Sequence, residues 1–339
     1  MPYHFHQFWV VCFGLLAVAA RAEEPLPVAL RMNGSAGLAA LSMIRTVAAP
    51  GVVRVLDDQG KTLLLGVVVS EDGYVLTKAS EAPVGHHLRL AWSDGRQGMA
   101  RVVRVDTELD LLLAKSDRDV TIPMAWQASA KMTSGEWVVA FTQATGVEDL
   151  QMRLGCLSAK RRRIPSHGAA MGISMEDVPG GEGVRITEVA SESPAEGAGL
   201  LPDDLLLAMD GEPVPNIRMI QRAIAAFQPG RVVQLLVRRG PQDRHCSLRL
   251  ASRSKVVSNW DGEDYANGGV SLRTDGFSEV LQHQLPLDPA DMGGPLLNLD
   301  GQPIGLNIAR VDRVTTFTLP MEVFWSKTQQ WMVEDRKGR

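Results

Sequence analysis

The side chains that could carry out hydrolytic chemistry are few and scattered. Nucleophilic catalysis needs a hydroxyl or thiol beside a base, most often a histidine held by a carboxylate. His86 and His87 come just before a predicted strand, where we expect exposed histidines, and His283 is expected to be a structural or surface residue. Ser271 and Ser278 have no recognisable motif around them. No ligand spacing typical of a metal site accompanies the histidine pair, and no glycine-rich loop opens a helix, so the sequence predicts neither a metal nor a cofactor.

The composition around these residues is that of a β-rich globular protein with more than one domain. The chain has 339 residues, of which 45% are hydrophobic and 22% charged, and its 32 glycines and 19 prolines accompany few long helical patterns. Short apolar strands separated by turns such as Asp72-Gly73 predict a barrel or a sandwich. The formal net charge of -4 argues against a nucleic-acid partner.

Residues 1–22 have the pattern of a secretory signal peptide. An apolar run over Phe8–Ala20 is too short to span a bilayer, and Ala20-Arg21-Ala22 is a small-residue cleavage pattern. We therefore expect cleavage near Ala22 and export of the mature protein, with an uncleaved anchor as the alternative. Residues 23–45 are expected to be a lead-in with a short helix around Gly37–Arg45.

Two cysteines, Cys156 and Cys246, follow the predicted signal. In an exported protein they can pair. Both lie in apolar, strand-like stretches, however, and two buried free thiols fit the sequence at least as well.

Four segments in a fixed order give the chain a family resemblance. They are Gly66–Thr77, Asp106–Leu113, Gly155–Ala159 and Phe277–Leu297, the last of which contains a Gly-Gly-Pro-Leu run. These segments resemble the HtrA (Deg) family of trypsin-like serine proteases, and their order is more diagnostic than any one of them. The resemblance implies a mainly β fold, a trypsin-like double β-barrel, with residues 46–160 forming the first barrel and the start of the second.

A second module interrupts this resemblance. Ser193–Val214 resembles part of a bacterial PDZ domain, although Asp203 replaces the usual glycine. We place an α/β PDZ domain at 164–253, inserted between strands of the second barrel, and the remainder of that barrel at 254–335. Insertion at a surface loop is physically inexpensive because the free energy of loop closure grows slowly with length. The basic run Lys160–Arg163 at the boundary is expected to be a solvated linker.

The resemblance assigns three residues of this chain to the positions of the catalytic triad, and two of these residues have side chains that cannot perform the catalytic role. In this fold the histidine base, the aspartate and the serine nucleophile follow one another in that order. The corresponding positions are Ser80, Asp110 and Met292. Serine has no nitrogen that titrates near neutrality, and a thioether has no proton for a base to remove. Asp110 is then expected to be a structural residue, and the N–H groups of Ala290 and Met292 to form no more than an anion-binding nest.

The PDZ resemblance implies a peptide groove. Such domains add an extended peptide to a sheet edge and hold its terminal carboxylate on successive backbone N–H groups. The corresponding loop and strand are Ala170–Met175, and the facing helix is Asn216–Phe227, whose apolar residues share one face. The predicted peptide-binding residues are Met171, Gly172, Ile173, Ser174, Met175, Ile220 and Ile224. The alternative is that the apolar residues among them are simply core.

These expectations combine into one functional hypothesis. The protein is expected to be an exported, HtrA-like pseudoprotease whose PDZ domain binds peptide C-termini or unfolded segments, as an adaptor, scaffold or chaperone-like protein. Its expected partners are such peptides, a second copy of the chain, or an active HtrA relative. Two alternatives come from other classes. One is an active HtrA-type serine endopeptidase with a non-standard site, and the other is a purely structural envelope protein with a closed groove.

Overall fold

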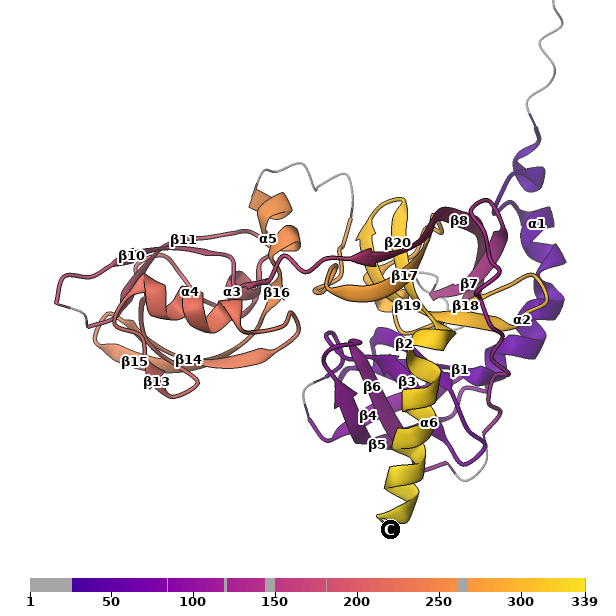
Figure 1. Ribbon diagram of the computed structural model, residues 1–339, viewed down its shortest axis with the longest axis horizontal. Helices are drawn as coiled ribbons and strands as arrows, with labels where there is room; N and C mark the ends of the chain where they lie inside the picture. Colours follow the sequence, from indigo (N-terminus) through magenta and orange to yellow (C-terminus); the bar gives the residue numbers. More distant parts are fainter. Residues whose placement is uncertain are drawn as a thin grey trace, which may run out of the picture.

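The computed structural model describes residues 26–338, with gaps at 84, 119–120, 144–149, 181 and 261–267. The expected signal peptide and its cleavage site near Ala22 therefore lie outside the described residues. Two closed β-barrels lie against each other, and a smaller α/β domain stands to one side of them (Figure 1). The prediction of a mainly β protein with a double barrel and an inserted α/β domain is confirmed.

The first barrel is built entirely from antiparallel pairs and closes in the order β1-β2-β3-β6-β5-β4. Its strands are β1 (Val52–Leu56), β2 (Thr62–Val68), β3 (Tyr74–Lys78), β4 (His87–Trp92), β5 (Gln97–Asp106) and β6 (Leu111–Ser116). The β2–β3 turn needs Gly73, whose φ is +89°, because a Cβ there would lie 2.5 Å from the Ser116 hydroxyl oxygen.

The second barrel takes strands from both sides of the inserted domain and closes in the order β17-β20-β19-β18-β7-β8. These strands are β7 (Trp137–Gln143), β8 (Leu150–Ile164), β17 (Phe277–His283), β18 (Pro295–Leu297), β19 (Pro303–Asp312) and β20 (Thr315–Pro320). A short 3-10 helix, η4 (Pro289–Asp291), comes just before β18.

The prediction that Lys160–Arg163 form a linker is wrong, because these residues continue strand β8, but three of the four are exposed to solvent as predicted. The Arg161 guanidinium forms ion pairs with Glu279 at 2.9 Å and Glu322 at 3.0 Å. A run of like charges is accommodated in a strand because alternate side chains point to opposite faces.

Helices at both ends pack on the barrels. The expected lead-in helix is divided at Leu41 into α1 (Ser35–Ala40) and α2 (Ser42–Ala48), which follow η1 (Val28–Leu30) and precede η2 (Ala49–Gly51). The long C-terminal helix α6 (Met321–Lys337) leaves the second barrel and crosses the first, where Asp335 accepts a hydrogen bond from the Tyr74 hydroxyl at 2.7 Å. Among the described residues no helix is both long enough and apolar enough to cross a membrane.

The inserted domain has a sheet in the order β10-β11-β12-β14-β15, with β13 paired to β12. Its elements are β9 (Ala169–Ala170), β10 (Ile173–Asp177), β11 (Val184–Val189), α3 (Pro194–Gly197), β12 (Leu205–Met209), β13 (Glu212–Pro213), α4 (Ile217–Ala225), β14 (Val232–Arg239), β15 (Gln242–Arg249), β16 (Ala251–Ser252) and the following helix α5 (Arg253–Trp260). Strand β9 pairs with β16, so the two ends of the domain are joined side by side.

Candidate functional site

The three positions predicted from the catalytic triad lie where the two barrels meet. Ser80 follows β3, Asp110 precedes β6, and Met292 precedes β18. The carboxylate of Asp110 accepts hydrogen bonds from the Ser80 backbone N–H at 2.7 Å and from the Ser80 hydroxyl at 2.9 Å. Asp110 itself has a φ of +61°, in the left-handed region that non-glycine residues rarely adopt. The structure thus joins two of the three positions directly and holds one of them in a strained backbone conformation.

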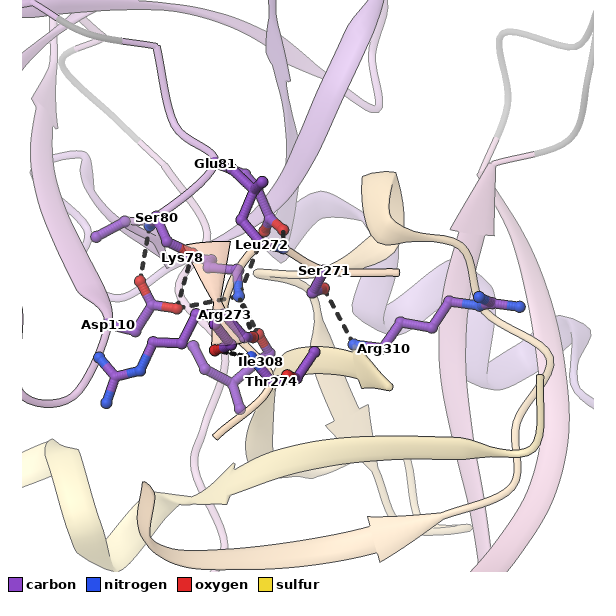
Figure 2. A network of polar contacts seen from close by, with 12 residues as sticks. Lys78, Ser80, Glu81, Asp110, Ser271, Leu272, Arg273, Thr274, Ile308 and Arg310 are labelled. Carbon is purple, nitrogen blue, oxygen red and sulfur yellow. Dashed lines mark hydrogen bonds and ion pairs between the residues drawn. The ribbon is translucent and has the colours of Figure 1, made fainter. Parts of the chain in front are cut away.

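A buried lysine that the sequence analysis did not single out completes this network. Lys78 is fully buried, and its ammonium lies 3.0 Å from Asp110 and 3.3 Å from Glu81 (Figure 2). It also donates to the carbonyls of Ile308, at 2.6 Å, and Arg273, at 3.4 Å. Its position at the inward end of a strand that is buried throughout is the signal that sequence reasoning overlooked. The aspartate carboxylate that would orient a base is therefore already neutralised by a buried cation.

Glu81 connects this cluster to the segment that leads back from the inserted domain. Its carboxylate accepts a hydrogen bond from the Leu272 backbone N–H at 2.5 Å. Burial raises the pKa of Glu81, the nearby Lys78 ammonium opposes that rise, and the Asp110 carboxylate adds to it. The Lys255 ammonium also opposes the rise in the pKa of Glu81, so cations from both sides of the inserted domain boundary act on this carboxylate.

Met292 packs as a core residue. Its side chain is fully buried in the apolar cluster between the barrels, together with Leu287, Leu285 and Ala82. Its N–H donates to the carbonyl of Pro289 at 3.1 Å, which closes the turn at the end of η4. That N–H is consequently engaged within the chain, contrary to the predicted anion-binding nest.

His283, one of the remaining candidate bases, is a buried structural residue. One ring nitrogen, Nε2, lies 3.0 Å from the side-chain oxygen of Asn307, and Nδ1 accepts from the Leu285 N–H at 3.3 Å. Burial lowers the pKa of His283 to about 4, so the ring is neutral at pH 7. His87, by contrast, is exposed at the start of β4.

The inserted domain docks directly on the loop after β3. The Arg249 guanidinium, at the end of β15, donates to the carbonyl oxygens of Ala79, at 3.4 Å, and Ser80. Gly230, before β14, packs against Ser80 so closely that a Cβ on the glycine would lie 2.6 Å from the serine Cβ. On the neighbouring segment, the Lys255 ammonium donates to the Val270 carbonyl at 3.1 Å. The position where a catalytic histidine would project is therefore covered by another domain.

A groove of about 700 Å³ lies on the inserted domain between its loop 168–172 and helix α4. Six of the seven predicted peptide-binding residues line it: Met171, Gly172, Ile173, Met175, Ile220 and Ile224. The seventh, Ser174, lies in β10 with its hydroxyl 3.5 Å from Glu188, and is not part of the lining.

The local backbone suits an extended ligand. Among the strands that the structure describes, β10 pairs with β11 alone and is therefore the edge of its sheet. Gly172 has a φ of +85°, and a Cβ there would lie 2.3 Å from that of Ser193, so the loop requires glycine for its own conformation. Asn216 caps α4 by accepting from the Met219 N–H at 3.1 Å, which sets the start of the facing helix. Ile220 is fully buried and Ile224 half-buried, so both contribute to the core as well as to the groove.

Potential metal ligands and the two cysteines are the other groups of chemical interest in the described part of the chain. No group of three potential metal ligands occurs among the residues described. Cys156 and Cys246 are both free and half-buried, and burial raises the pKa of the Cys246 thiol.

Comparison with known proteins agrees with this architecture. The PDZ domain family matches residues 169–250. A probable periplasmic serine endoprotease DegP-like of Halomonas elongata is 23% identical over 292 residues, which cover 62% of this chain and 60% of that protein. The protein of the same description from a Marinomonas species is 32% identical over 108 residues, covering 32% of this chain and 23% of the relative.

Among solved structures, the serine endoprotease from Yersinia pestis aligns at 18% identity over 62% of this chain and 97% of that chain, with a TM-score of 0.32. The chain spans at most about three fifths of the length of the two curated relatives that it matches. The chain is thus similar to DegP-like serine endoproteases over about three fifths of its length, and residues 169–250 match the PDZ domain family.

Proposed function

We propose that this protein is an exported pseudoprotease whose PDZ domain binds peptide C-termini or unfolded segments, and that it acts as an adaptor, scaffold or chaperone-like protein. The main observation in favour of a loss of catalysis is the set of contacts that the Asp110 carboxylate makes. Its carboxylate is shared between the Lys78 ammonium and the Ser80 hydroxyl, in the place where it would have to orient an imidazole.

The nucleophile position supports the same conclusion. Met292 is fully buried, and its N–H is hydrogen-bonded to Pro289, so neither a nucleophilic atom nor this N–H faces a substrate. The loop around Ser80 is covered by Arg249 and Gly230 of the PDZ domain. The barrels then serve as a rigid support that fixes the position of the PDZ domain.

The groove supports the binding part of the proposal. It combines a free sheet edge at β10, a glycine-containing loop and an apolar lining contributed by Met171, Ile173 and Ile220. These features are what strand addition of a peptide with an apolar C-terminal residue requires. Methionine in the lining adapts to side chains of different shape.

Cellular location and partners are part of the proposal. Two relatives are described as probable periplasmic proteins, which favours export of this chain as well. A second copy of the chain or an active relative of the same family is the proposed assembly partner.

The decisive test has two arms. Purified protein without residues 1–22 is incubated with unfolded casein and with a fluorophosphonate probe, and we expect neither digestion nor a labelled serine. The same protein is screened against a library of peptides with free C-termini, and we expect binding of those that end in an apolar residue. Digestion of casein that a substitution in this protein abolishes would refute the pseudoprotease assignment and favour an active endopeptidase.

A matched pair of variants assigns peptide binding to the groove. Ile224→Lys places a charge in the lining, whereas Met219→Lys places the same charge on the exposed face of the same helix, at a side chain that is 43% exposed. We expect the first to lose binding and the second to retain it. Gly172 is unsuitable for this purpose because its positive φ and the contact with Ser193 make any side chain there distort the loop. Equal binding by both variants would locate the peptide elsewhere.

A further inference from the structure

One wall of the groove comes from outside the segment that matches the PDZ family. The match ends at residue 250, and helix α5 begins at Arg253. Arg253 and Val256 of this helix both line the groove. Val256 is 5% exposed, and its Cγ1 lies 3.5 Å from the position that a Cβ on Gly172 would occupy. The helix therefore lies directly against the loop on which a peptide carboxylate is proposed to rest.

The placement of Arg253 is fixed by backbone hydrogen bonds. Its N–H donates to the carbonyl of Gly168 at 2.9 Å. The two residues before it pair with β9, with Ser252 opposite Ala169 and Ala251 opposite Ala170. The start of α5 is thus tied to the first residues of the groove loop, and the Arg253 side chain reaches the groove from an anchored backbone.

The charge pattern of the groove points to an anionic ligand group. Among the described residues, its lining contains two that can carry positive charge, His167 and Arg253, and none that is acidic. His167 is already engaged, since its Nδ1 lies 3.1 Å from the Asp275 carboxylate. Arg253 is an exposed residue at the lining of this largely apolar groove, and its guanidinium has no hydrogen bond or ion pair with any described residue. A guanidinium in this setting gains most from a carboxylate, which it binds through two parallel hydrogen bonds.

We propose that Arg253 binds the terminal carboxylate of the peptide and that Val256 packs against its last side chain, so that α5 makes the groove selective for free C-termini ending in an apolar residue. This assignment rests on the proposed peptide-binding function and adds the residues that determine its specificity. Internal unfolded segments, which lack a terminal carboxylate, bind more weakly.

The test compares one peptide in two chemical forms. A library peptide that binds the intact protein is synthesised with a free C-terminus and with a C-terminal amide, and both are titrated by fluorescence anisotropy. For wild-type protein we expect the free acid to bind at least about tenfold more tightly than the amide, the effect of one charge-assisted hydrogen-bonded pair. Arg253→Gln should lower affinity for the free acid about tenfold and leave affinity for the amide unchanged, while Arg253→Lys should restore part of the loss.

Arg222→Gln is the matched control, because Arg222 is exposed on α4 and does not line the groove. We expect it to bind both peptide forms like the wild type. The assignment would be overturned if Arg253→Gln kept full affinity for the free acid, or if it lost affinity equally for both peptide forms. Either result would leave the proposal of peptide binding intact. Absence of binding by the wild-type protein would overturn the proposed function and this assignment with it.

Discussion

Removing the charge of Lys78 is expected to destabilise the double barrel strongly. The ammonium is fully buried and faces the carboxylates of Asp110 and Glu81 at 3.0 and 3.3 Å. Lys78→Met keeps most of the side-chain volume and removes the cation, which leaves two buried carboxylates without their shared partner. Breaking a buried ion pair from one side costs about 3–5 kcal/mol. For a body of this size the melting temperature should fall by roughly 6–20 °C.

The pH dependence of this loss follows from the pKa of Glu81. Burial and the Asp110 carboxylate raise that pKa, and Lys78 is the main group lowering it, so the substitution raises it further. A group whose pKa is raised in the folded state contributes stability at low pH and loses it as pH rises through the folded-state pKa. Lys78→Met should therefore be most destabilised near pH 8 and should recover part of its stability near pH 5.

The measurement is thermal or urea denaturation followed by circular dichroism between pH 5 and pH 8. The double variant Lys78→Met with Glu81→Gln removes one carboxylate together with the cation, and it should be more stable at pH 8 than the single variant. The reasoning that this lysine neutralises the carboxylates would be refuted if Lys78→Met were as stable as the wild type at pH 8. It would also be refuted if the loss of stability grew as the pH fell toward 5.

Three further outcomes are expected. The pKa of His283 is about 4 in the folded protein and 6.5 ordinarily, so this residue lowers the free energy of unfolding by up to about 3 kcal/mol as pH falls from 6.5 to 4. Buried Asp291, whose pKa is raised to about 6, has the opposite effect on stability. The stability difference between His283→Gln and wild type should thus shift in favour of the variant on acidification, and a constant difference in urea denaturation would contradict this. Arg249→Ala should weaken docking of the PDZ domain by about 2 kcal/mol and enlarge the radius of gyration in small-angle scattering. Ser80→His with Met292→Ser should not digest casein, because the position of the new imidazole is occupied by the PDZ domain; digestion would show that the site is intact.

Much of the architecture could be predicted because it depends on local patterns. Alternating strands with Asp-Gly turns, the Ser193 region and the apolar face of α4 are all readable in short windows. The start of the facing helix at Asn216 was readable in the same way, and Asn216 caps that helix.

The parts that could not be predicted depend on contacts between distant residues. Lys78 meets Asp110 across 32 positions and the Ile308 carbonyl across 230, separations at which no sequence pattern operates. The contacts of Arg249 with the Ser80 loop are of the same kind. The linker prediction for Lys160–Arg163 failed for a related reason, because the partners that hold Arg161 in a strand lie 118 and 161 residues away.

The pairing of β9 with β16 has a consequence for the order of folding. Strands β8 and β17 are neighbours in the second barrel, yet one ends at Ile164 and the other begins at Phe277. Once β9 and β16 are joined, the chain that must still close is about fourfold shorter, which lowers the entropy penalty of closing it by about 1.2 kcal/mol. The inserted domain, whose own contacts are more local, is therefore expected to fold first and to act as a template that brings the two halves of the barrel into register. Substitutions that destabilise only the inserted domain would then slow the folding of the second barrel, although they lie outside it.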